Sequence, residues 1–162
     1  MEQGHASQTA TLAAMLRAAH VLWDPAPHIL SDTLAAGLAG FDDEAALNGA
    51  LQSFEAELAH VCSPSAARRW MEGSRLAITM RSRYAEDELE SAIGRGVTQY
   101  VILGASLDSF AYRRRDLEDV VKVYELDHPL TQQKYFLPCL ARRRAAEIVH
   151  AQPQTAPGDG DR

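Results

Sequence analysis

The sequence is poor in cysteine, lacks a long apolar run and carries no excess of basic residues. Its two cysteines among 162 residues, Cys62 and Cys139, form no CxxC pair, so reduced thiols are expected rather than a disulfide framework. No stretch approaches the roughly 20 apolar residues that a membrane-spanning helix requires. The first nine residues are polar and lack the pattern of a signal peptide. We therefore expect a cytoplasmic protein with no membrane partner.

The charge balance argues against a nucleic-acid partner. The formal net charge is -6, whereas nucleic-acid binding requires a basic surface that neutralises phosphates. Two short basic runs, residues 113–115 and 142–144, are typical of a solvated surface. A metal site is not expected either, because His20, His28 and His60 lack the spacing of metal ligands.

Strand-like segments are scarce in the first hundred residues, which are predicted to be helical. Apolar residues recur at spacings of three and four over residues 7–21 and 42–61, as in helices that bury one face. A short helix is expected over residues 32–38. A longer one is expected over residues 65–93, with an interruption at Gly73.

Two runs rich in β-branched and aromatic residues follow, at residues 100–103 and 120–126, and both are predicted to be strands. Such continuous apolar runs are typical of strands covered on both faces, and the long connection favours parallel pairing through a right-handed crossover. A helix is expected from Pro129, with a kink or stop at Pro138. Sheets usually hold about 4 to 6 strands, so we expect that the chain is truncated or that a partner supplies strands.

The turn after the first run has the residues of a nucleotide-type binding site. Gly104 permits a sharp turn and close approach of a ligand. Asp127 lies 23 residues further on, where a carboxylate can accept hydrogen bonds from a ribose diol. A pyrophosphate requires bare backbone donors, whereas this turn carries Ser106, Asp108 and Ser109. An acidic turn suits S-adenosylmethionine (SAM), which has an ammonium, a sulfonium and no phosphate, better than it suits NAD.

Each of these residues also has an ordinary structural interpretation. Gly104 could form a plain strand-to-helix turn, and Asp127 could cap the helix expected after it. Arg83 could form an ion pair with Asp87, one helical turn away. The residues by themselves leave both interpretations open.

Five segments resemble one known family in their order and spacing. They are Ser7-Gln-Thr-Ala10, Arg17-Ala-Ala-His20, residues 81–89 (RSRYAEDEL), residues 101–113 (VILGASLDSFAYR) and residues 124–132 (YELDHPLTQ). Together they resemble the leucine carboxyl methyltransferase-like family of class I SAM-dependent methyltransferases. This family includes the protein phosphatase carboxyl methyltransferases and bacterial polyketide O-methyltransferases. The resemblance covers about residues 7–137.

The resemblance implies an α/β fold, with an N-terminal helical lid followed by the start of a Rossmann-like class I methyltransferase sheet. Residues 1–96 would form the helical lid region, and residues 97–150 the N-terminal half of the SAM-binding domain. Residues 151–162 are rich in Pro, Gly and Asp, and a disordered tail is expected there.

The resemblance also implies SAM as the cofactor and a role for each matching residue. Arg83 would pair with the SAM carboxylate, and Asp127 would bind the ribose. The turn Gly104-Ala105-Ser106 would lie beneath the methionine part, and Asp108 matches the acid of that turn. The family has glycine where this chain has Ser106, so a positive φ there would strain the serine by about 1 kcal/mol or more.

The expected function is SAM-dependent methyl transfer to an oxygen of a small-molecule carboxylate or hydroxyl. No catalytic residue can be named. The alternative is a truncated or degenerate methyltransferase-like domain that does not catalyse and acts through binding. An NAD-binding oxidoreductase half-domain is disfavoured by the acidic turn. The expected partners are the methyl acceptor and either a second copy of the chain or another strand-supplying protein.

Overall fold

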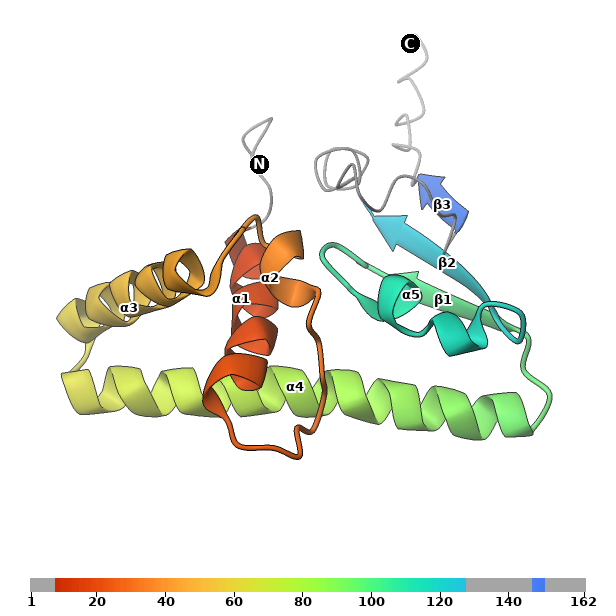
Figure 1. Cartoon of the computed structure of the whole chain (residues 1–162), viewed down its shortest axis with the longest axis horizontal. Helices are drawn as coiled ribbons and strands as arrows, with labels where there is room; N and C mark the ends of the chain where they lie inside the picture. The colour runs from red at the N-terminus through yellow and green to blue at the C-terminus, as the bar shows by residue number, and fades with distance from the viewer. Residues whose placement is uncertain (1–7, 128–146, 151–162) are drawn as a thin grey trace, which may run out of the picture.

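The structure, a computed structural model, describes residues 8–127 and the strand at residues 147–150. The described elements are, in chain order, α1 (Gln8–Trp23), α2 (Ala35–Leu38), α3 (Glu44–Val61), α4 (Pro64–Gly94), β1 (Gln99–Leu103), α5 (Phe110–Arg113), the 3-10 turn η1 (Arg115–Leu117), β2 (Lys122–Asp127) and β3 (Glu147–His150). Helix α4 forms the base of the molecule in Figure 1. Helices α1, α2 and α3 lie over its N-terminal half, and the sheet with α5 lies over its C-terminal half. The predicted order of a helical region followed by a parallel α/β sheet is confirmed.

Helix α4 runs without a break for 31 residues, or about 46 Å at a rise of about 1.5 Å per residue. The hydroxyl of Ser63 caps its first turn by accepting a hydrogen bond from the Ala66 amide at 3.3 Å. The predicted interruption at Gly73 is wrong. A glycine inside a helix costs only about 1 kcal/mol, and Met71 and Ile78 on either side of it pack into the same hydrophobic cluster. That packing keeps both halves helical.

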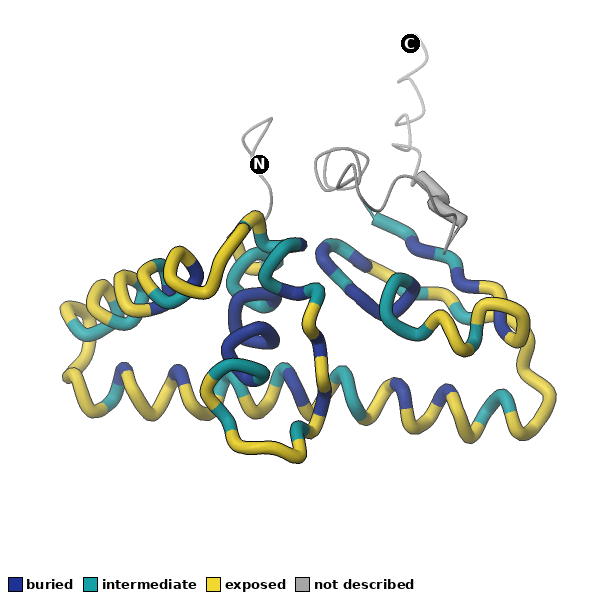
Figure 2. The backbone as a smooth tube through the Cα atoms, viewed as in Figure 1, coloured by how far each residue is buried: buried dark blue, intermediate teal, exposed yellow. Residues whose placement is uncertain are grey.

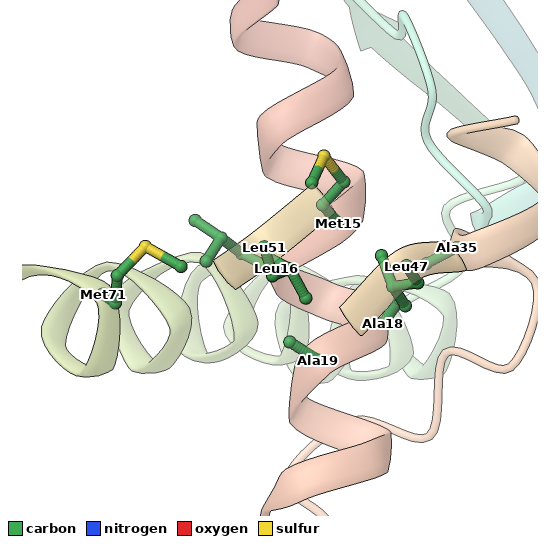
Figure 3. Packing of buried hydrophobic residues seen from close by; sticks show 8 residues of the cluster. All are labelled: Met15, Leu16, Ala18, Ala19, Ala35, Leu47, Leu51 and Met71. Atoms are coloured by element: carbon green, nitrogen blue, oxygen red, sulfur yellow. The ribbon is translucent and has the colours of Figure 1, made fainter. Parts of the chain in front are cut away.

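The main hydrophobic cluster, here called the lid core, lies where α1 crosses α4. Its buried members come from four helices and are labelled in Figure 3: Met15, Leu16, Ala18, Ala19, Ala35, Leu47, Leu51 and Met71. Burial of each large side chain contributes roughly 1.5–3 kcal/mol. Helix α1 is the most enclosed, because every residue from Ala14 to His20 is buried (Figure 2). More of α1 is therefore buried than the predicted apolar stripe, because the polar residues Arg17 and His20 are buried as well.

The sheet is parallel and its strand order is β1-β2-β3. Tyr100 pairs with Val123 and Ile102 with Glu125, which confirms the predicted parallel pairing of the two runs. Strand β3 pairs parallel with the other edge of β2. The sequence analysis did not predict β3, because Glu147–His150 contains only two apolar residues between polar ones.

One face of β1 is covered and the other is exposed. Tyr100 and Ile102 pack in a second hydrophobic cluster whose buried members are Leu89, Phe110, Ala111, Val121 and Val123. On the opposite face Val101 is 50% exposed and Leu103 76% exposed. The expectation that β1 is covered on both faces is therefore wrong for the part of the chain that the structure describes. The physical reason is that α4 and α5 both contribute to the same cluster and so cover the same side.

The start of one helix differs from that predicted, and other predictions are not tested. Helix α2 begins at Ala35 rather than Asp32, because the Asp32 side chain turns inward and binds Arg17. The helix expected from Pro129, its stop at Pro138 and the disordered tail lie outside the described residues. Among the helices of residues 8–127, none is long and apolar enough to cross a membrane.

Candidate functional site

The connection from β1 to α5, residues 104–108, is here called the glycine turn. Two of its residues have positive φ angles, Gly104 at 66° and Ser106 at 49°. The Gly104 amide donates to the Leu126 carbonyl at 2.8 Å, and the Asp108 amide donates to the Ala105 carbonyl at 2.8 Å. An L-residue in the left-handed region costs roughly 1–2 kcal/mol. Serine therefore occupies a position that favours glycine.

Asp127 is the last residue of β2 and lies next to the glycine turn. Its carboxylate accepts a hydrogen bond from the Ser106 amide. The carboxyl ends of neighbouring parallel strands are where open α/β sheets bind their ligands. The structure thus brings Asp127 together with Ser106 and the rest of the glycine turn at one end of the sheet, and the ribose-binding role of Asp127 stays a prediction.

Asp108 sits at the far end of the glycine turn and has a structural role. Its carboxylate accepts a hydrogen bond from the Phe110 amide at 2.7 Å and so fixes the start of α5. Burial raises the pKa of Asp108, while this hydrogen bond and the nearby charge of Arg17 act in the opposite direction. A carboxylate that is hard to ionise is poorly suited to a direct charge contact.

Glu125 is a buried acid beside the site, outside the described lining of the cleft, and the sequence patterns did not single it out. It lies on β2 and is only 8% exposed. Burial, together with the charges of Asp108 and Asp127, raises the pKa of Glu125 to about 7. An acid inside a run rich in β-branched and aromatic residues was the signal that could have revealed it. The acidic residues make this end of the sheet unsuitable for a phosphate.

A cleft of about 650 Å³ opens between the glycine turn and the lid. Its lining comes from α1, α4, the end of β1, the glycine turn and Asp127: Thr9, Ala10, Ala13, Arg17, Arg81, Ser82, Ala85, Ile102, Leu103, Gly104, Ala105, Ser106, Leu107, Asp108 and Asp127. Small-molecule sites typically measure about 300–1,000 Å³. The cleft is therefore large enough for a nucleoside-sized ligand.

The structure does not bring Arg83 into this cleft. Arg83 instead pairs with Asp87 on the surface of α4, with its side chain 44% exposed. The hydrogen bond to Asp87 raises the pKa of Arg83. Arg81, two residues earlier, is the arginine of α4 that lines the cleft. In the sequence Arg81-Ser82-Arg83, either arginine could have been the one that lines the cleft. They differ only in the direction that each faces on α4.

These features define a nucleotide-type ligand site on a parallel α/β sheet under a helical lid. Its charged groups are Asp127 at the end of β2, Asp108 in the glycine turn, Arg17 of α1 and Arg81 of α4. Within residues 8–127, no group of three His, Cys, Asp or Glu side chains is placed to hold a metal ion.

Comparison with known sequences identifies the family. The profile described as leucine carboxyl methyltransferase matches residues 10–135, which include both walls of the cleft. The chain belongs to the leucine carboxyl methyltransferase family.

Individual relatives agree with this assignment. A Bacillus subtilis protein, YktD, provisionally named an S-adenosyl-L-methionine-dependent methyltransferase, is 33% identical over 141 residues. That alignment covers 82% of this chain and 46% of the relative. A Frankia alni protein with the same provisional description is 40% identical over 63 residues, which are 39% of this chain and 21% of the relative. The chain thus spans less than half the length of these relatives.

Proposed function

We propose that the chain binds SAM in the cleft between the glycine turn and the lid, as part of a SAM-dependent O-methyltransferase with a Rossmann-like sheet. The observation that carries this proposal is the glycine turn joined to Asp127 at the carboxyl ends of two parallel strands. The sequential order β1-β2-β3 corresponds to one half of a doubly wound sheet. Membership of the methyltransferase family supports the same conclusion.

The chemistry of the cleft fits SAM. Asp127 lines the cleft, where its carboxylate would accept hydrogen bonds from a ribose diol, and Gly104 has no Cβ to keep a ligand from its backbone. No atom would lie within 4 Å of a Cβ added at Gly104, so this side of the turn is open. Arg81 on the opposite wall can pair with a carboxylate, a role for which its position favours it over Arg83. The surrounding carboxyl groups suit a ligand with ammonium and sulfonium groups.

The reaction we propose is methyl transfer to an oxygen of a small-molecule carboxylate or hydroxyl. Bound SAM would supply an activated methyl group on sulfur. The residues of this chain would hold the cofactor and keep water from it, since positioning and water exclusion are the main contributions that a protein makes to such a displacement. The described lining of the cleft contains no histidine, and we assign no general base.

A second candidate function is binding without catalysis. Ser106 stands in the cleft at a φ of 49° where its family has glycine. A SAM-binding or protein-binding module would satisfy this observation. The two candidates differ in whether radiolabelled methyl groups from SAM appear on an added acid or alcohol.

Calorimetric titration of the full chain with SAM tests the proposed site. We expect saturable binding, and a loss of affinity of about tenfold or more when Arg81→Met removes a charge-assisted contact. Arg83→Met is the matched control from the same helix and should bind like the wild-type protein. Absence of binding to the wild-type chain at millimolar SAM would refute the proposal.

The opposite result for the two arginine variants would assign the cofactor carboxylate to the other arginine. If Arg83→Met weakens binding and Arg81→Met does not, the cofactor carboxylate pairs with Arg83 and the surface ion pair with Asp87 breaks on binding. Asp127→Asn should also weaken binding, whereas Asp119→Asn, an exposed acid outside the cleft, should have no effect.

A further inference from the structure

Arg17 of α1 is a buried arginine that joins the lid to the glycine turn. Its Nε atom donates to the Asp32 carboxylate at 2.8 Å, and its Nη2 atom donates to the Leu107 carbonyl at 2.6 Å. The arginine side chain is 10% exposed and that of Asp32 is 0% exposed. One guanidinium group therefore holds a lid residue and a backbone atom of the turn at the same time.

Asp32 holds the other side of the same turn. Its Oδ2 atom, which binds Arg17, also accepts a hydrogen bond from the Ser109 hydroxyl at 2.7 Å. Leu107 and Ser109 flank Asp108, so the lid is hydrogen-bonded to the chain on both sides of that residue. Asp32 precedes α2 and is 77 positions from Ser109 in the sequence, so this contact exists only when the lid is docked.

Arg113 extends this network of charged contacts from Asp32 to helix α4. The Nε atom of Arg113 lies 4.0 Å from the Asp32 Oδ1 atom, and its Nη2 atom pairs with Glu86 of α4. The glycine turn and α5 are thus fixed between lid and base by buried charges. Asp32 Oδ1 accepts no hydrogen bond within the described residues, so Arg113 meets it by a charge contact alone. Buried polar networks favour one arrangement of the groups that they join.

We propose that Arg17 is a positioning residue that gives the glycine turn its ligand-binding shape and couples docking of α1 to binding in the cleft. This inference rests on the proposed function of the cleft as a SAM site. Arg17 reaches the turn through a backbone carbonyl, so it acts on the conformation of residues 104–108 rather than on their side chains. Because coupling is reciprocal, a ligand in the cleft must also stabilise the docked position of α1.

Arginine is required here because of its shape as well as its charge. The planar guanidinium group directs two donors along separate, fixed directions, whereas a lysine ammonium is a point charge on a flexible stem. Arg17→Lys keeps the charge opposite Asp32 and loses the fork that reaches Leu107. The double variant Arg17→Met with Asp32→Asn removes both charges and so avoids leaving one buried charge without its partner.

Amide hydrogen exchange in the free protein, followed residue by residue, tests the positioning role. The reporters are the amides of Ser106, Asp108 and Phe110, which donate hydrogen bonds that fix the turn to Asp127, to Ala105 and to Asp108, respectively. We expect exchange there to become about tenfold faster or more in Arg17→Lys and in the double variant. The dissociation constant for SAM should rise by a similar factor.

Arg75→Lys is the matched control. Arg75 forms a comparable ion pair with Asp24, at 3.0 and 2.8 Å, with its side chain 14% exposed, and it does not contact the glycine turn. It should lower overall stability without changing exchange in the turn or affinity for SAM. Equal effects of Arg17→Lys and Arg75→Lys on the three reporters would overturn the proposal.

Two further outcomes are distinguishable. Weaker SAM binding with unchanged exchange in the free turn would show that Arg17 contacts the cofactor directly, which contradicts a positioning role. If the wild-type chain binds no SAM, the proposed function fails, and the exchange of the turn amides still decides whether Arg17 shapes the turn. In the wild-type protein SAM should slow exchange in residues 14–18 of α1, and in Arg17→Lys this protection should be reduced.

Discussion

Ser106 shows how much one residue can matter in the candidate site. It combines a φ of 49° with a hydroxyl that is shielded from solvent and has no hydrogen-bond partner within the described residues. Each feature is unfavourable, the first through backbone strain and the second through lost hydration. Strained positions that persist in a structure are concentrated at functional sites, and Ser106 lines the cleft.

We therefore expect Ser106→Gly to stabilise the protein by about 1 kcal/mol or more, because glycine adopts this φ without strain and removes the shielded hydroxyl. Urea unfolding monitored by circular dichroism measures the change. Ser91→Gly, at an exposed position of α4, is the control and should destabilise by about half a kcal/mol. A loss of stability in Ser106→Gly would mean that the hydroxyl forms a contact beyond the described residues.

At the scale of elements, the position of Glu125 on strand β2 explains why its pKa is raised. Register places Glu125 beside Ile102, and it alternates with Tyr124 and Leu126 so that it shares the covered face with Val123. The neighbouring strand and α5 remove water from that face. A carboxyl group in this position is protonated in the folded protein at pH values where it is ionised in the unfolded chain.

The stability of the protein should therefore depend on pH through Glu125. Its pKa is raised from 4.5 to about 7, so its favourable contribution is complete below about pH 4.5 and is lost as the pH rises to about 7. The total loss is up to about 3 kcal/mol. Glu125→Gln should match the wild type near pH 4.5 and exceed it in unfolding free energy at pH 8.

Unfolding in urea at the two pH values makes this comparison. Glu118→Gln, which removes an exposed acid paired with Arg115, is the control and should show little difference between the two pH values. If Glu125→Gln and wild type differ equally at both pH values, the Glu125 side chain is not the group that titrates.

At the scale of the whole molecule, two hydrophobic clusters share one helix. The lid core packs on the N-terminal half of α4, and Leu89 in the C-terminal half belongs to the second hydrophobic cluster, which packs against the sheet. Among the described strands β1 pairs with β2 alone, and one face of β1 exposes Val101 and Leu103. Open edges and exposed apolar faces of sheets favour association with another chain.

We accordingly expect self-association of the isolated chain, with a mass of about twice 17.8 kDa by light scattering at micromolar concentration. Val101→Lys, at the exposed face of β1, should restore the monomer because a charge opposes strand pairing. Val61→Lys, at an 86% exposed position at the end of α3, should not. A monomeric wild-type chain would exclude the homo-oligomer and leave a different strand-supplying protein as the proposed partner.

The sequence by itself determined the features that depend on local patterns. Spacing of apolar residues predicted the helices, β-branched runs predicted β1 and β2, and the placement of Gly104 and Asp127 predicted the turn of the site. It could not choose between Arg81 and Arg83, because two residues on a helix differ only in the direction that they face. It could not find β3, or the continuous course of α4 through Gly73.

Only the tertiary structure decided the features that join distant segments. Arg17, Asp32 and Ser109 meet through hydrogen bonds that span 15 and 77 positions, and no local pattern links them. The φ of Ser106 and the raised pKa of Glu125 likewise arise from what packs around them. Local sequence sets which element each residue joins, whereas burial and charge contacts depend on how those elements pack, and that packing shapes the cleft.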